Sequence, residues 1–247
     1  RSKLVIATKV HGRMEDDDPN AAGNSRRHIV EQCEASLKRL QTDYVDLYQI
    51  HRPDSQIPID ETLRALDDLV RSGKVRYIGT STYAAWQSVE ALWASRELGL
   101  SRFVSEQPPY SLADRRIERE LLPMARTYGY GIIPWSPLAG GLLTGKYGRG
   151  KEMPEDGRYS DPSRTNTARR MTERLFDVLE EFQAYVDRRG VKLSQFALAW
   201  VLHQPGGTSP IIGSLTMEQL HDNLGALEIE ITDEDRAKVD EIVPPGT

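Results

Sequence analysis

The sequence predicts an α/β protein built on a parallel sheet, and three observations lead to this fold class. Apolar runs of strand length alternate along the chain with segments of helical period. The strand runs are rich in leucine, valine and isoleucine, as expected of parallel strands that are covered on both faces. Glycine follows several of the helical segments and provides a sharp stop before the next strand.

The elements follow in order from these patterns. The six expected strands are Leu4–Ala7, Tyr44–His51, Val75–Ser81, Phe103–Gln107, Gly131–Trp135 and Ser209–Ile212. The expected helices are Arg26–Leu40, Ile59–Ser72, Trp86–Leu98, Arg115–Tyr128, Arg170–Arg188, Ser194–Gln204, Thr216–Leu224 and Asp233–Ile242. In the first helix, Ile29, Cys33 and Leu37 recur at helical spacing. Ser25, just before it, is a suitable N-cap.

The number of strands narrows the fold class. A (β/α)8 TIM barrel needs eight parallel strands, and six are expected here. An open doubly wound sheet could use six, but it would carry a glycine-rich fingerprint after its first strand, and none follows Ala7. We therefore expect one TIM-barrel domain over residues 1–247, with the first two β/α units absent from them. Gly145–Thr167 has no period, and we expect a long functional loop there.

Composition argues against several classes of protein. The formal net charge is −5, and the basic residues are not gathered beside aromatic ones, so no nucleic-acid partner is expected. Cys33 is the only cysteine, so no internal disulfide can form. No apolar run approaches the roughly 18 residues of a membrane helix. We expect a cytoplasmic protein with no membrane partner and no metal site.

Residues suited to binding or catalysis stand at the ends of all six expected strands. They are Lys9, His51, Ser81 with Thr82, Gln107, Trp135 with Ser136, and Gly213 with Ser214. In a parallel barrel these ends line the active-site mouth. An imidazole can move a proton, an amide and a hydroxyl can pair with a carboxamide, and an aromatic ring can stack on a flat heterocycle. Taken alone, His51 could simply cap a strand; the whole set indicates a nicotinamide dinucleotide site.

Six motifs, in this order and spacing, resemble the aldo-keto reductase superfamily. The pattern is most similar to the bacterial reductases that also resemble potassium-channel β-subunits. The motifs are Ala7–Lys9, Tyr48–Pro53, Gly79–Thr82, Glu106–Tyr110, Trp135–Tyr147 and Gly213–Asn223. Because they extend along most of the chain, the match is specific.

The resemblance implies an oxidoreductase that transfers hydride from NADPH to the carbonyl of an aldehyde or ketone. The family's catalytic set is aspartate, tyrosine, lysine and histidine, and Lys9 and His51 match the last two. The lysine would lower the pKa of the tyrosine, which protonates the carbonyl oxygen, while His51 would orient that oxygen. The resemblance places the aspartate and tyrosine upstream of Arg1.

The resemblance also implies a set of cofactor-binding residues. They are Ser81, Thr82, Gln107, Trp135, Ser136, Pro137, Leu138, Gly140, Leu142, Lys146, Arg158, Gly213, Leu215, Gln219, Asp222 and Asn223. Thr82 departs from the common asparagine, and Leu215 stands where many relatives carry a basic residue. Lys146 and Arg158 are therefore the candidates for binding a 2′-phosphate, unless they are solvated loop charges. NADP(H) is the favoured cofactor and NAD(H) the alternative.

Three hypotheses for function remain open at this point. The first is an NADPH-dependent reductase of a small-molecule carbonyl substrate. The second is a cofactor-binding regulatory subunit with little turnover, as in the channel-associated branch; that branch tends to replace the histidine, so His51 favours catalysis. The third is an inactive barrel fragment, because six strands cannot close the barrel. Substrate identity and a homo-oligomeric state are left open.

Overall fold

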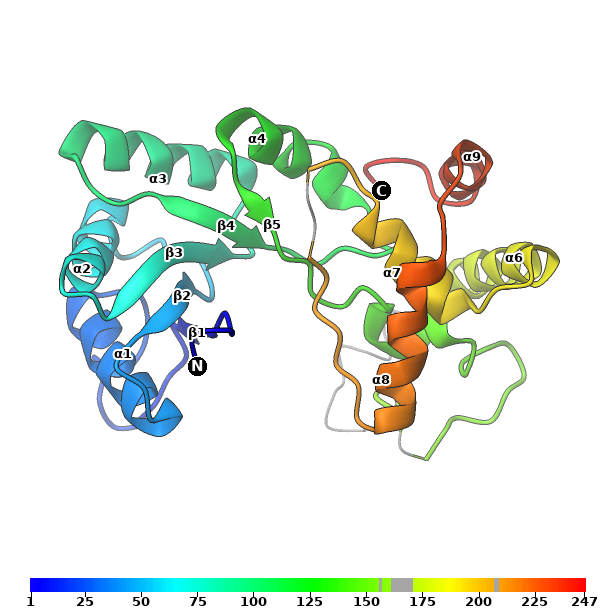
Figure 1. Ribbon diagram of the computed structural model, residues 1–247, viewed down its shortest axis with the longest axis horizontal. Coiled ribbons are helices and arrows are strands. Elements are labelled where there is room, and N and C mark those ends of the chain that lie inside the picture. The colour runs from blue at the N-terminus through cyan, green and yellow to red at the C-terminus, as the bar shows by residue number, and fades with distance from the viewer. Residues whose placement is uncertain (156, 161–170, 207–208) are drawn as a thin grey trace. The chain divides into compact units, whose positions relative to one another are not determined.

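The computed structural model describes residues 1–155, 157–160, 171–206 and 209–247 (Figure 1). They form two compact units. Unit 1 comprises Arg1–Pro108 and Met124–Ile132, and unit 2 comprises Pro109–Pro123 and Ile133–Thr247.

Unit 1 is a five-stranded parallel sheet in the order β1-β2-β3-β4-β5. The strands are β1 (Ala7–Val10), β2 (Val45–Ile50), β3 (Val75–Ser81), β4 (Phe103–Gln107) and β5 (Gly131–Ile132). The helices that connect them are α1 (Arg26–Leu40), α2 (Ile59–Arg71), α3 (Ala85–Leu98) and α4 (Leu121–Tyr128). Each strand lies beside its neighbour in sequence, as successive βαβ units produce (Figure 1). The predicted α/β class with a parallel sheet is confirmed.

The helix α1 shows why this sequence folds as predicted. The Ser25 hydroxyl accepts a hydrogen bond from the backbone N–H of His28 at 3.3 Å, so the predicted N-cap is confirmed. The apolar side chains at helical spacing, Ile29, Cys33 and Leu37, are buried. Burial raises the pKa of the Cys33 thiol to about 11. The helix is therefore held by one apolar stripe.

The strand β2 is buried along its whole length, as expected of a central parallel strand. The buried face of α2, which carries Leu63, Leu66 and Leu69, contacts the neighbouring strand β3. One acidic residue, Asp46, lies at the start of β2 and is bonded to Arg1 at 2.8 Å and Arg76 at 3.0 Å. These contacts fix the strand whose C-terminal end carries His51.

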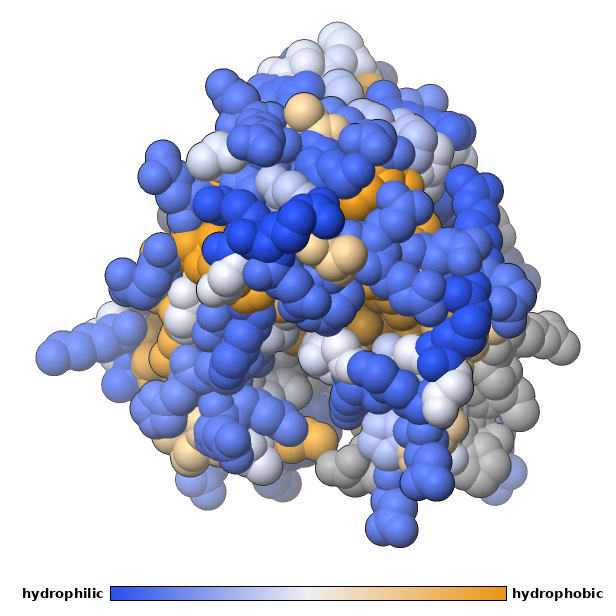
Figure 2. All heavy atoms as spheres, turned by 90° about the vertical axis from the view of Figure 1, so that its right-hand side faces the viewer, coloured by the Kyte–Doolittle hydropathy of each residue, from blue (hydrophilic) through white to orange (hydrophobic). Residues whose placement is uncertain are grey.

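Unit 2 is mainly helical. Its described helices are α6 (Glu173–Arg189), α7 (Leu193–Leu202), α8 (Met217–Leu224) and α9 (Asp233–Ile242), with 3-10 turns at Arg116–Glu118, Ala139–Thr144 and Gly225–Glu228. The helix α7 is buried almost all round, as its apolar sequence requires. The face on which α6 and α9 lie is largely hydrophilic (Figure 2).

Three predicted strands differ from the structure. The first begins later than predicted, at Ala7, and Leu4 and Val5 are 61% and 82% exposed. The fifth stops at Ile132, because Pro134 has no N–H to donate to a ladder. The last, Ser209–Ile212, is not a strand. Among the described residues, its one backbone hydrogen bond runs from Ile211 N to Pro134 O at 2.8 Å, and Pro210 interrupts any ladder.

Two predicted helices also differ. The segment Arg115–Tyr128 is divided into a 3-10 turn and α4, since Pro123 cannot donate into the preceding turn and fits only near a helix start. The helix predicted from Arg170 begins at Glu173. Arg170 itself, and part of the predicted loop Gly145–Thr167, lie outside the described residues.

Candidate functional site

The two predicted catalytic residues stand at the ends of neighbouring strands of unit 1. Lys9 lies opposite Gln49 in the parallel register of β1 and β2. Gln49 and His51 are two residues apart, so all three side chains belong to the same face of the sheet. The His51 backbone N–H donates to Val10 O at 2.9 Å, which extends the pairing to the last residue. The structure brings Lys9 and His51 together.

The electrostatics of this pair suit proton handling. Burial lowers the pKa of Lys9. Partial burial, followed by the positive charges of Lys9 and Arg52, lowers the pKa of His51 and favours the neutral imidazole. Within the described part of the chain, the Lys9 ammonium has no ion pair or hydrogen bond. It is available to a group that approaches the strand ends.

Ser81 and Gln107 continue the same face across β3 and β4. Gln49 lies opposite Gly79, and Ser81 opposite Gln107, so the face runs without interruption from Lys9. The Ser81 hydroxyl donates to the backbone oxygen of Gln107 at 2.9 Å. The Gln107 side-chain amide makes no hydrogen bond to any described residue. An amide with both its donor and its acceptor free can pair with a carboxamide.

The backbone after several of these strands is strained. Thr82, after β3, has φ 63° and Ser136 has φ 56°, both in the left-handed region. His11, after β1, has φ 145°. Thr82 donates its backbone N–H to Gln107 O at 3.3 Å, and its hydroxyl accepts a hydrogen bond from Arg52. Strained non-glycine residues often cluster at functional sites, so these three positions are candidates for one.

In unit 2, Trp135 begins the segment that was predicted to cover the pyrophosphate. Its carbonyl accepts a hydrogen bond from Tyr110 N at 3.3 Å, and Pro137 is buried behind it. Gly140 and Gly141 have φ 71° and 105°, which only glycine adopts readily. The other residues predicted in this segment, Ser136, Leu138 and Leu142, lie in the same turn and its entry.

The cations Lys146 and Arg158 flank this glycine turn. A Cβ added to Gly141 would lie 3.3 Å from Lys146 Cε, and one added to Gly140 would lie 3.5 Å from Arg158 Cδ. Both cations are exposed, and Lys146 lies over the Tyr147 ring at 5.3 Å. Two positive charges beside this glycine turn form a setting that suits phosphate.

The helix α8 carries the predicted adenosine-side residues. Gln219 Oε1 accepts from Leu215 N at 2.8 Å, and Asn223 Nδ2 donates to Ser214 Oγ at 2.9 Å, so both side chains order the turn after Gly213. A Cβ added to Gly213 would meet nothing within 4 Å. Leu215 is 84% exposed.

Asp222 differs from its neighbours on α8, because it faces α7. Its carboxylate accepts hydrogen bonds from Lys192 and, at 3.2 Å, from Ser194. It therefore joins two helices of unit 2 and fixes the position of α8.

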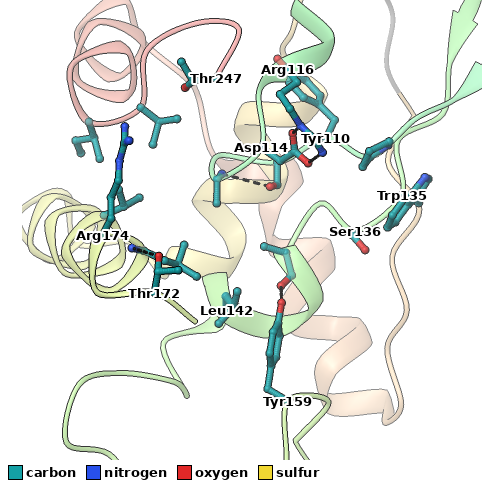
Figure 3. Close-up of a pocket in the computed structure, with 18 residues that line it drawn as sticks. Tyr110, Asp114, Arg116, Trp135, Ser136, Leu142, Tyr159, Thr172, Arg174 and Thr247 are labelled. Carbon is teal, nitrogen blue, oxygen red and sulfur yellow. Dashed lines mark hydrogen bonds and ion pairs between the residues drawn. The ribbon is translucent and has the colours of Figure 1, made fainter. Parts of the chain in front are cut away.

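Unit 2 also contains a pocket of about 550 Å³ (Figure 3). Trp135, Ser136 and Leu142 line it together with residues of α6 and the C-terminal segment. Arg174 stands at the side opposite Trp135 (Figure 3) and has no ion pair within the described residues. The lining combines the aromatic rings of Tyr110, Trp135 and Tyr159 with the cations Arg116 and Arg174, and such a pocket would admit a small organic molecule.

Sequence reasoning missed two buried polar residues near the strand ends. Gln49 lies between Lys9 and Ser81 on the same face, and its Nε2 donates to Thr80 O at 3.4 Å. Its signal was a polar residue two positions before His51. Glu106 is inside a recognised motif, but its side chain belongs to the opposite face of the sheet from Gln107. Nothing in the sequence indicated its environment.

Among the described residues, no group of side chains could hold a metal ion, and no helix is long and apolar enough to cross a membrane.

Comparison with known proteins identifies the family. A model of the Aldo/keto reductase family matches residues 1–244. The chain is 42% identical over 252 residues to the uncharacterized oxidoreductase YrpG of Bacillus subtilis, covering 100% of the chain and 74% of that protein. It is 39% identical to a probable voltage-gated potassium channel subunit beta of Arabidopsis thaliana, covering 93% of the chain and 70% of that protein. A putative channel subunit of this kind in Schizosaccharomyces pombe is 38% identical, with 98% and 72% covered.

These matches confirm the resemblance drawn from the six motifs, and they support an oxidoreductase activity. With the family model spanning nearly all its residues, the chain belongs to the aldo/keto reductase family.

Proposed function

We propose that the protein reduces the carbonyl group of an aldehyde or ketone with NADPH, on a (β/α)8 barrel. The observation that carries this proposal is the single face shared by Lys9, His51, Ser81 and Gln107. It sets a proton-handling pair beside a free amide at the carboxyl ends of parallel strands, where barrel enzymes have their active sites.

The residues of this chain fit a nicotinamide dinucleotide. Gln107 offers an unbonded side-chain amide and Ser81 a hydroxyl, which suit the carboxamide. In unit 2, the Gly140–Gly141 turn with Lys146 and Arg158 suits the phosphates, and Trp135 offers a ring for stacking. When bound, the reduced nicotinamide supplies the hydride.

The catalytic residues would act on the carbonyl oxygen. His51, with its lowered pKa, would donate a hydrogen bond from its neutral imidazole and orient that oxygen. Lys9 would place its charge beside a tyrosine, lower the pKa of the phenol and so ease proton transfer to the oxygen. The resemblance supplies this tyrosine, and an aspartate that holds the lysine, from sequence before the lysine. Lys9 and His51 are thus half of the proposed set.

We propose NADPH over NADH because Lys146 and Arg158 are the cations beside the glycine turn. An exposed leucine at position 215 offers the 2′-phosphate no charge. Selectivity for NADPH over NADH would therefore come from the loop that carries Lys146 and Arg158 rather than from the start of α8.

The test is turnover by the complete protein with NADPH and a panel of aldehydes, followed by the absorbance of the reduced cofactor. Lys9→Met should lower kcat by 10²-fold or more, at the scale of general acid–base catalysis, while cofactor binding remains. Lys3→Met, which changes an exposed lysine of the same segment, is the matched control and should keep full activity. No consumption with any aldehyde would refute the proposal.

A second candidate function is a cofactor-binding regulatory subunit. The observation in its favour is the similarity to proteins named as probable potassium channel subunits beta. Tight NADPH binding without turnover, together with a stable partner protein in pull-downs, would support it against the reductase.

A further inference from the structure

We propose, on the basis of the proposed function, that Glu106 is a positioning residue for the cofactor amide site. Its buried carboxylate holds the turn after β3 in the conformation that presents Ser81, Thr82 and Gln107. Glu106 would not touch the cofactor, because its side chain belongs to the other face of the sheet from Gln107.

Glu106 has no exposed surface, and an isolated charge in such a place is costly. It lies opposite Thr80 in the register of β3 and β4. No lysine, arginine or histidine forms an ion pair with it within the described residues. The carboxylate must therefore be stabilised by neutral donors.

Those donors come from both strands and from the turn. The Thr80 hydroxyl donates to Glu106 Oε2, and the backbone N–H of Tyr83 donates to Oε1 at 3.1 Å. The backbone N–H groups of Thr82 and Gln107 also favour the charged form. An ionised carboxylate accepts at both oxygens and donates nothing, so it suits this set of donors.

The turn needs such an anchor. Thr82 has φ 63°, and a β-branched residue is an outlier in the left-handed region. Thr82 N donates to Gln107 O at 3.3 Å, and Arg52 donates to its hydroxyl, so the residue is held from two sides. Glu106 binds the next amide, that of Tyr83, and closes the turn. Without it, the strained residue would be free to relax and move Ser81.

The protonation state of Glu106 links this anchor to pH. Burial raises the pKa of Glu106 to about 7, although the hydrogen bonds from Thr80 and the backbone lower it. The titratable groups that face it are Tyr83, from the turn, and Tyr130, from the segment before β5. Burial raises the pKa of both phenols, so they stay neutral near pH 7. The carboxylates of Asp54 and Glu90 also act on Tyr83.

A proton on Glu106 would remove one acceptor from the anchor. Cofactor affinity should therefore fall as pH falls from 8 to 6. The experiment measures the Kd of NADH by fluorescence titration, because NADH lacks the titrating 2′-phosphate. Glu106→Gln should weaken binding about tenfold at pH 8, the scale of a lost charge-assisted hydrogen bond, and should flatten the pH profile. Repeating the series on His51→Gln removes the titration of the imidazole.

The matched control is Asp67→Asn. Asp67 is another buried carboxylate of unit 1 that accepts a backbone hydrogen bond, from Ser101 N at 2.8 Å, but it does not contact the turn. Loss of the Asp67 carboxylate should lower the free energy of unfolding and leave the Kd of NADH unchanged. This comparison separates positioning from general weakening of the fold.

A second variant tests the strain directly. Asparagine tolerates the left-handed region, so Thr82→Asn added to Glu106→Gln should restore the order of the turn in the cofactor-free protein, where no contact with cofactor contributes. Amide hydrogen exchange of the cofactor-free protein should be faster at Tyr83 in Glu106→Gln and slower again in the double variant. An unchanged Kd, pH profile and exchange rate in Glu106→Gln would overturn the inference alone. Wild-type protein that binds no NADH or NADPH would overturn the proposed function and the inference with it.

Discussion

Asp235 and Glu106 are both carboxylates without exposed surface, yet their pKa values move in opposite directions. For Asp235, burial raises the pKa, but hydrogen bonds from Thr232, Tyr185 and Arg189 outweigh burial and lower it. For Glu106, burial outweighs neutral donors. Hydrogen bonds thus decide the direction of the pKa shift for Asp235, whereas burial decides it for Glu106.

The opposite shifts give opposite pH dependence of the free energy of unfolding. The contribution of Asp235 is present above its unfolded pKa of about 4 and is lost as pH falls through its lower folded pKa. The contribution of Glu106 is present below its unfolded pKa of about 4.5 and is lost as pH rises to about 7. The shift of Glu106 amounts to about 3 kcal/mol.

Asp235→Asn should lower the free energy of unfolding by about 1–3 kcal/mol at pH 7, because the buried side chain loses its charge-assisted hydrogen bonds of 2.9 Å with the half-exposed Arg189. Urea denaturation measures the change. Asp233→Asn, an exposed change in the first turn of the same helix, should shift it by less than about 0.5 kcal/mol. Equal effects of the two substitutions would contradict the role given to the buried Asp235 carboxylate.

At the scale of elements, the sequence predicted best where the local pattern and the tertiary packing agree. The strands Val75–Ser81 and Phe103–Gln107 and the helix Asp233–Ile242 have the predicted bounds. Two of the failures share one cause, which is proline in an apolar run: Pro210 interrupts a predicted strand and Pro123 sets the start of a helix. An apolar pattern shows burial, whereas a ladder or helix also needs an N–H at each position.

The candidate site follows the same logic. Lys9, His51 and Gln107 could be found from the sequence because each closes a strand, and parallel strands end at one edge. Glu106 could not, since its role depends on donors brought by Thr80 and Tyr83, more than twenty residues earlier in the chain. The local sequence pattern shows where a residue lies in its strand, but it does not show which donors a neighbouring strand or turn brings to its side chain.

The N-cap of α1 allows a test of how much one local sequence signal contributes to stability. Ser25→Ala should lower the free energy of unfolding by about 1 kcal/mol, because the backbone N–H of His28 loses its acceptor. Denaturant unfolding followed by circular dichroism measures the loss. Ser55→Ala, in an exposed position before α2, is the control and should be close to neutral. A Ser25→Ala variant as stable as wild type would show that the cap is not needed.

At the scale of the whole molecule, the predicted cofactor residues are divided between the two units. Ser81, Thr82 and Gln107 belong to unit 1, and the segment from Trp135 to Asn223 belongs to unit 2. A ligand that binds only the folded protein stabilises the folded state by mass action. Cofactor binding and global stability are therefore coupled in the proposed function.

NADPH at 100 times its Kd should raise the free energy of unfolding by about 2.7 kcal/mol, seen as a higher Tm in a thermal shift assay. NADH at the same concentration should raise it less. Replacing both Lys146 and Arg158 with methionine should remove the difference, because these cations flank the glycine turn. Arg126→Met, which changes an exposed arginine of α4, should leave the difference between NADPH and NADH unchanged. Equal shifts with both cofactors in wild type would refute the assigned selectivity.

The fully buried Cys33 gives the molecule a built-in reporter. It is the chain's only cysteine, and its raised thiol pKa leaves little reactive thiolate at neutral pH. A thiol reagent can label the chain only when α1 lifts from the sheet, so the labelling rate counts those excursions. The labelling rate of Cys33 therefore measures how often α1, the helix before the His51 strand, opens in the native state.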